Sequence, residues 1–260
     1  MGPQGYAMEF SVKNCFDSSA YRKVPVTKTL RPNYLLRGQR IWRTISLENA
    51  NNRQILNSGG KCAQLGLFEI IKFGLLEKKL HAFNTDDPAA KNALPLKESD
   101  IIKLLKYTNT DTITVFDANG DEKKEINISN NYLLGKDIKS FLLKEDWVMN
   151  SHSGKQEKYI VALAPLVYDS KTETVGPLFW LYYPEWEGFL ACFEAKNYYS
   201  QEKISFKDIL NYKYFISKID KSSNIFDRDF KTENRGENNI QKDEGLKEQL
   251  QTNESDHFPY

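Results

Sequence analysis

The feature that most constrains the fold is a run of six apolar residues at 178–183, which Pro184 follows directly. A strand with one face in water alternates apolar and polar side chains, and this run does not alternate. The run therefore predicts a central strand that is covered on both faces of its sheet. A chain of 260 residues is long enough to bury a core of that kind.

Several other segments show the alternation of ordinary strands. Residues 112–128 form a predicted β-hairpin, because Ile113 and Val115 alternate with threonines and Asn119-Gly120 favours a type I′ turn. Residues 41–45 alternate like a strand or enter a helix, and further strands are predicted over 138–149 and 159–168.

Helical periodicity is clearest over residues 62–80. Apolar residues recur there at spacings of three and four, namely Leu65, Phe68, Ile71, Leu75 and Leu76. Shorter helices are predicted over 97–106, 186–196 and 206–212, and a loop over 49–60. The fold class that follows is α+β: a mostly antiparallel sheet with helices packed outside it, and an extended N-terminal arm.

Composition and charge divide the chain into three parts. Residues 1–35 hold three prolines and little periodicity and predict an extended arm, residues 36–230 the α+β domain, and residues 231–260 a polar, flexible tail. The net charge is only +1, so no global field attracts nucleic acid or a membrane surface. The ends differ in sign: residues 1–43 carry eight basic and two acidic residues, and residues 231–260 four basic and seven acidic. Opposite ends could attract copies head to tail, although two solvated flanks explain the pattern as well.

The three cysteines, Cys15, Cys62 and Cys192, lie outside metal-ligand spacing of one another, and an odd number cannot pair fully within one chain. Each is expected to be a small buried hydrophobic residue, so the cysteines do not identify the redox compartment. The N-terminal residues lack the pattern of a signal peptide, and no stretch approaches the length of a membrane span.

Catalytic motifs are scarce. The sequence contains neither a G-x-S-x-G nucleophile elbow nor a G-x-G-x-x-G loop. A thiol enzyme would need Cys62 or Cys192 beside His81 or His152, and a hydrolase would need paired acids such as Glu185 with Glu187. A loop histidine and solvated acids explain these residues more simply, so no cofactor and no metal site are predicted.

Three segments together resemble one family. They are RIWRTISLE at residues 40–48, LKEDW at 143–147, and VALAP at 161–165 followed by PLFWLYYPE at 177–185. Shorter matches are SFKD at 205–208, NIFDR at 224–228 and, more loosely, AFNTDD at 82–87. In this order they resemble the GldN/PorN family of the gliding-motility and type IX secretion machine of Bacteroidetes.

The resemblance implies a non-enzymatic periplasmic subunit. Its implied partners are an outer-membrane lipoprotein of GldK/PorK type, with which it would form a large multi-copy ring, and the periplasmic part of a GldM/PorM-type protein. The alternatives are a periplasmic hydrolase or thiol enzyme, and a peptide-binding module that uses a strand edge beside residues 178–183.

Candidate partner-binding residues come from the matched motifs, where tryptophan and arginine stand close together, as in binding hot spots. They are Arg40, Trp42, Arg43, Lys144, Glu145 and Trp147. The competing interpretation is structural: Lys144, Glu145 and the acid that follows would form a salt-bridged strand edge. Trp180, inside the apolar run, is predicted to be core.

Overall fold

The computed structural model describes residues 12, 15–21, 35–56, 59, 62, 65–90, 92–116, 122–150, 154–169, 172–198 and 200–224. The predicted turn at Asn119-Gly120, the residue His152 and the predicted tail lie outside these residues. The division into arm, domain and tail at residues 35 and 230 stays a prediction.

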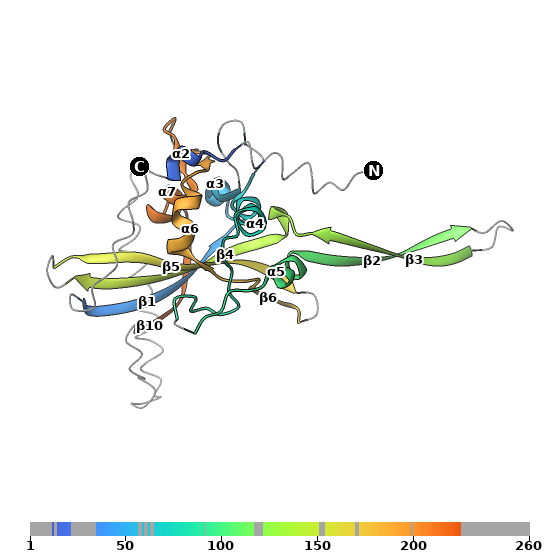
Figure 1. Cartoon of the computed structure of the whole chain (residues 1–260), viewed down its shortest axis with the longest axis horizontal. Helices are drawn as coiled ribbons and strands as arrows, with labels where there is room; N and C mark the ends of the chain where they lie inside the picture. The colour runs from blue at the N-terminus through green and yellow to red at the C-terminus, as the bar shows by residue number, and fades with distance from the viewer. Residues whose placement is uncertain are drawn as a thin grey trace, which may run out of the picture.

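A six-stranded antiparallel sheet forms the centre of the molecule (Figure 1). Its order is β10-β1-β4-β5-β6, and β7 also pairs with β5. The strands are β1 (Leu35–Ser46), β4 (Ile138–Asn150), β5 (Gln156–Asp169), β6 (Thr174–Pro177), β7 (Leu181–Tyr182) and β10 (Lys218–Asn224). The α+β prediction is confirmed, and the strands predicted over 138–149 and 159–168 correspond to β4 and β5. Residues 41–45, for which a strand and a helix start were both open, lie in β1.

Helices cover one side of this sheet (Figure 1). They are α3 (Arg53–Leu56), α4 (Leu67–Glu77), α6 (Tyr183–Leu190) and α7 (Phe206–Asn211). The apolar stripe predicted for 62–80 is buried at Leu65, Phe68, Ile71 and Leu75, which pack with the sheet residues Phe141 and Leu163 in the main core. The helix itself is shorter than predicted.

The opposite side of the sheet has a smaller core. Phe83, Ala162, Ala164 and Trp180 pack there, whereas Leu163, between the two alanines, belongs to the main core. Since successive residues of a strand point to opposite faces, the centre of β5 at 162–166 has apolar residues at every position. Both faces of the sheet centre are therefore buried.

The apolar run at 178–183 is covered on both sides as predicted, because Phe179 and Leu181 lie in the main core and Trp180 in the smaller one. The long strand predicted there is wrong: only Leu181–Tyr182 pair with β5. Helix α6 already begins at Tyr183, with Pro184 in its first turn, where the missing N–H costs nothing. The helix predicted over 186–196 thus starts earlier and ends at Leu190.

Four short elements lie in or beside segments that the sequence predicts to be a loop or a helix. The loop predicted over 49–60 contains the 3₁₀ helix η2 (Ala50–Asn52), in which Asn52 is buried, and helix α3, in which Gln54 and Ile55 are buried. After α6 the chain turns into β8 (Glu194–Ala195), which pairs with β9 (Ile204–Ser205). None of these elements is long enough to leave a periodic signal in the sequence.

The predicted hairpin is confirmed and is longer than expected. Strands β2 (Lys106–Phe116) and β3 (Glu122–Tyr132) pair with each other along their whole length. Helix α5 (Glu98–Leu104) precedes the hairpin, and η4 (Gly135–Asp137) leads from it into β4. The ladder projects away from the six-stranded sheet (Figure 1).

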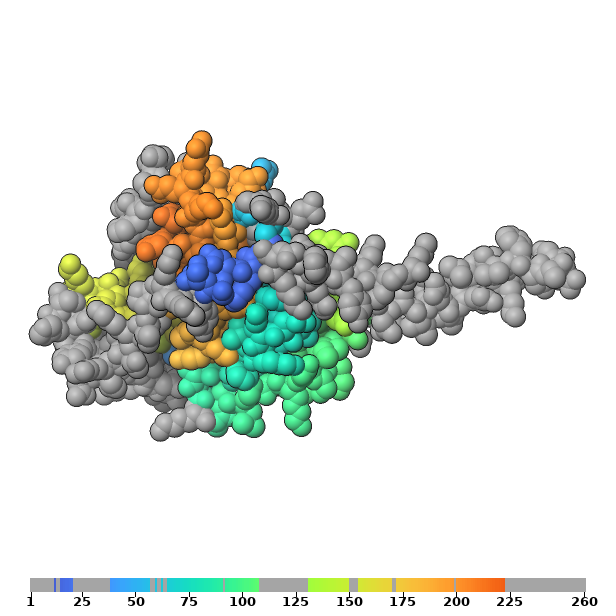
Figure 2. Space-filling view, turned by 45° about the horizontal axis from the view of Figure 1, so that its top comes forward, coloured from blue at the N-terminus to red at the C-terminus, as the bar shows by residue number. Residues whose placement is uncertain are grey.

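A disulfide joins the N-terminal segment to the body, and this corrects the expectation that Cys15 and Cys62 are merely buried apolar residues. Residues 15–21, which include α2 (Ser18–Tyr21), lie over the α6 region and beside α4 (Figure 2). Phe16 packs there against Phe189 and Phe193, with ring centroids 5.8 and 5.6 Å away. Cys192 is buried as a thiol, as predicted.

No helix within the described residues is both long and apolar enough to cross a membrane.

Candidate functional site

The first two matched motifs lie side by side on β1 and β4. The antiparallel register pairs Arg40 with Asp146, Ile41 with Glu145, and Trp42 with Lys144. Alternation along each strand then separates the motif residues onto two faces of the sheet. Arg43, Glu145 and Trp147 share the face of Ile41, whereas Arg40, Trp42, Lys144 and Asp146 share the other.

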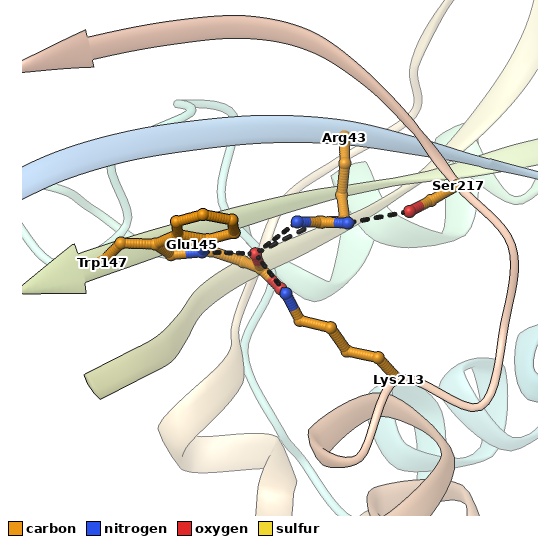
Figure 3. Close-up of polar contacts among 5 residues, drawn as sticks. All are labelled: Arg43, Glu145, Trp147, Lys213 and Ser217. Carbon is orange, nitrogen blue, oxygen red and sulfur yellow. Dashed lines mark hydrogen bonds and ion pairs between the residues drawn. The ribbon is translucent and has the colours of Figure 1, made fainter. Parts of the chain in front are cut away.

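Glu145 is the centre of the first group. Its Oε2 accepts hydrogen bonds from Arg43 Nε at 3.1 Å, from Trp147 Nε1 at 2.8 Å and from Lys213 Nζ at 3.2 Å (Figure 3). A second nitrogen of Arg43, Nη2, lies 3.0 Å from the same oxygen. Arg43 Nη1 donates to Ser217 Oγ at 2.9 Å. One carboxylate oxygen thus holds groups from β1, β4 and the segment after α7.

Because the group is buried, its ion pair matters for the stability of the fold. The Arg43 and Glu145 side chains are each 1% exposed, and Lys213 is 20% exposed. A buried ion pair is costly to form but far costlier to break, because the remaining charge is left without water. Three cations also face the Trp147 ring: Lys158 at 4.0 Å, Lys213 at 4.9 Å and Arg43 at 5.8 Å from its centroid. The group therefore holds two strands and the loop before β10 together, and we call it the structural lock.

The opposite face holds a second charged group. Arg40 Nε and Nη2 donate to the two carboxylate oxygens of Asp146 at 2.7 and 3.0 Å, and this bidentate hydrogen bonding raises the pKa of Arg40. Lys144 donates to the backbone carbonyl of Asp86, and burial lowers the pKa of Lys144. The Asp86 contact ties the segment after α4 to the sheet.

Trp42 lies between two lysines on this face. The ammonium groups of Lys144 and Lys221 are 5.4 and 4.6 Å from the centroid of its ring. Trp42 is half-buried, as is Arg40, whereas Lys221 is exposed. Arg40 and Trp42 are therefore the two candidate partner-binding residues that solvent, or another protein, can contact.

The structure thus brings the six candidate residues together on two adjacent strands and divides them by accessibility. Arg43, Lys144, Glu145 and Trp147 are buried and bind one another or backbone within this chain. Replacing Arg43 together with Trp42 would therefore disturb folding as well as any partner surface. The partner-binding role of the six residues stays a prediction.

Sequence reasoning missed Lys213, Ser217 and Asp86. Each belongs to a segment far along the chain from the residue it binds, so no local pattern indicates the contact. Lys213 does have an unusual backbone, with φ of 55°, and it follows Tyr212, the C-terminal cap of α7. Glycine or asparagine is the common residue in that conformation, and lysine there suggests a side chain that is needed for a contact.

The remaining matched motifs also have local structural roles. Ser205 and Asp208 of SFKD form a capping box at the start of α7: Ser205 Oγ accepts from Asp208 N, and Asp208 Oδ2 accepts from Ser205 N at 2.9 Å. Trp180 and Phe83 exchange two backbone hydrogen bonds of 2.8 Å, which joins PLFWLYYPE to AFNTDD.

The enzymatic alternatives find little support among the described residues. Cys62 is in the disulfide, and Cys192 donates to the carbonyl of Gly188 from within the core. His81 Nδ1 lies 2.7 Å from Glu185 Oε1 on the exposed surface. No group of three or more His, Cys, Asp and Glu side chains in the described ranges could hold a metal ion.

A comparison with protein-family models matches residues 30–258 to a family described as "Gliding motility associated protein GldN". The match includes every strand and helix described above except α2. A search of the curated proteins found no match to the chain.

Proposed function

Because the chain belongs to the GldN family of gliding-motility proteins, we propose that it is a non-enzymatic structural subunit of the gliding and type IX secretion machine. In this proposal it lies in the periplasm and assembles with an outer-membrane lipoprotein of GldK/PorK type into a large ring. It also contacts the periplasmic part of a GldM/PorM-type protein. The observation that carries the proposal is the family match over residues 30–258.

The use of the polar residues supports a structural role. The charged residues of the motifs are engaged in holding β1, β4 and the loop before β10 together, as the contacts of Glu145 show. An enzyme would instead direct such groups toward a substrate.

The disulfide supports the periplasmic location. Disulfides persist in oxidising compartments, the bacterial periplasm among them, and are rare in the cytosol. Cys15 and Cys62 are 47 residues apart and lie within bonding distance only in the folded chain. Their pairing fits a protein that folds or matures outside the cytoplasm.

The peptide-binding alternative rests on one observation. Strand β6 ends the sheet within the described residues, directly before the apolar run, and Val175 on it is 51% exposed. However, β6 has only four residues, including Gly176 and Pro177, and so offers a short edge for strand addition. The ring-subunit proposal is therefore preferred.

Cell fractionation tests the proposed location and partner together. Cells that make both this chain and the GldK-type lipoprotein should hold the chain in the outer-membrane fraction. Cells that lack the lipoprotein should release it with the soluble periplasmic proteins, which provides the matched control. A chain found in the cytoplasm, or one whose fraction does not depend on the lipoprotein, would contradict the proposal.

A further inference from the structure

The β2–β3 hairpin is much longer than the fold of this chain requires. Each strand has 11 residues, about 36 Å at the usual rise per residue, whereas typical strands have five or six. Within the described residues the two strands form a sheet of their own, apart from the six-stranded one. Figure 1 shows the ladder extending away from the body.

A projecting two-stranded ladder is physically unfavourable unless something binds it. An isolated hairpin is at best marginally stable in water, and its outer edges present unpaired backbone N–H and C=O groups. Proteins normally shorten or cover such edges. A ladder of this length therefore suggests a partner that adds a strand to it.

The first residues of β3 suggest which strand that is. Residues 122–125 read Glu-Lys-Lys-Glu, and residues 218–221, which open β10, read Lys-Ile-Asp-Lys. If residues 122–125 and 218–221 pair as neighbouring strands, parallel or antiparallel, each charged residue of 218–221 lies opposite a residue of opposite charge. Strand β10 is an edge of the main sheet among the described strands, and Lys218, Asp220 and Lys221 are exposed.

The same tetrad argues against pairing between two hairpins. Two copies of Glu-Lys-Lys-Glu place glutamate against glutamate and lysine against lysine in either direction, so a symmetric contact is repulsive. A contact between β3 of one copy and β10 of the next uses two different surfaces of the same chain. Contacts of that head-to-tail kind generate rings when their rotation closes.

We propose that the outer edge of β3 pairs with the outer edge of β10 on a second copy of this chain, so that each copy extends one hairpin and receives another. The inference rests on the proposed function, since a multi-copy ring supplies the neighbouring copy.

Two variants of the full chain test the pairing. In the first, residues 108–130 are replaced by Asn-Gly, which closes the ladder as a two-residue turn at the paired residues Tyr107 and Asn131. In the second, Lys218→Glu and Lys221→Glu reverse the charge of the receiving edge. A rescue variant adds Glu122→Lys and Glu125→Lys, which restores opposite charges between copies. Circular dichroism and thermal melting check that each variant folds.

The readout is the particle mass, by sedimentation, of each chain alone and with the GldK-type lipoprotein. The shortened and charge-reversed variants should lose self-association at least tenfold in affinity, and the rescue variant should recover it. The shortened variant, which leaves the Trp42 surface unchanged, should still bind the lipoprotein. Rings of unchanged mass from the shortened variant, or no recovery by the rescue variant, would overturn the inference and leave the proposed function intact. Self-association that depends on the hairpin without any lipoprotein binding would support the inference while the proposed function fails. A full chain that is monomeric in both settings would overturn both.

Discussion

Removing the negative charge at the centre of the buried group should strongly destabilise the fold. Glu145→Gln keeps the size and shape of the side chain but removes the counter-charge of Arg43, which is 1% exposed. Breaking a buried ion pair in this way costs about 3–5 kcal/mol, because the remaining charge has lost its counter-charge and is not solvated by water. The cost falls on folding, since Arg43 and Ser217 connect β1 to the loop before β10.

The assay is urea unfolding followed by circular dichroism, with thermal melting as a second measure. For a domain of this size each kcal/mol lowers the Tm by about 2–4 °C, so a decrease of about 6–20 °C is expected. The matched control is Glu98→Gln. Glu98 pairs with Lys79 at 2.9 Å, but the two side chains are 60% and 64% exposed. That change should cost less than about 1 kcal/mol.

A second comparison separates the broken pair from the lost contacts. Arg43→Met combined with Glu145→Leu removes both charges and keeps apolar volume, so it should be less destabilising than Glu145→Gln alone. Lys213, which is 20% exposed, can turn toward solvent in that variant. If Glu145→Gln cost no more than the exposed control, the view of this group as a structural lock would be wrong.

Three further predictions follow from the packing and the titrating groups. Gly74→Ala should destabilise the protein by about 1–3 kcal/mol in urea unfolding, although alanine favours helices, because its Cβ would lie 2.6 Å from the Trp186 ring; equal or greater stability would contradict the close packing. Reducing the Cys15–Cys62 disulfide, or replacing Cys15 by serine, should lower the free energy of unfolding by about 4 kcal/mol, as the loop-entropy relation gives for a separation of 47 residues. Thermal melting measures the effect: reductant should lower the Tm of the unmodified chain and should not change the Tm of the serine variant. Burial raises the pKa of Tyr183 well above 10, so the unfolded state loses the phenol proton first and the stability of the fold should decrease as pH rises above about 10. Tyr183→Phe should weaken this pH dependence of the Tm. An unchanged slope of Tm against pH would show that Tyr183 is not its source.

Local patterns predicted the elements that rely on local physics. Period-two alternation identified the hairpin, and spacing of three and four identified α4, whose apolar stripe packs in the main core. The strand pairing of the run at 178–183 was harder to predict. Burial on both sides removes the alternation of apolar and polar residues, so a long strand cannot be distinguished from an extended segment in which only two residues pair. Its burial was predicted correctly and its pairing was not.

The contacts of the candidate site were beyond sequence reasoning for a different reason. The motif residues on β1 and β4 stood out in the sequence, but Lys213 and Asp86 join them only through the fold, across 68 and 58 residues of chain. The Cys15–Cys62 pair shows the same limit, since three cysteines allow several pairings and none has a local signal.

The mass and shape of the complex with the GldK-type lipoprotein test the central proposal most directly. The two proteins, co-expressed and purified together, should form particles many times heavier than a one-to-one complex and ring-shaped in negative stain. A chain that remains a 30.1 kDa monomer in the presence of the lipoprotein would contradict the account of a ring subunit.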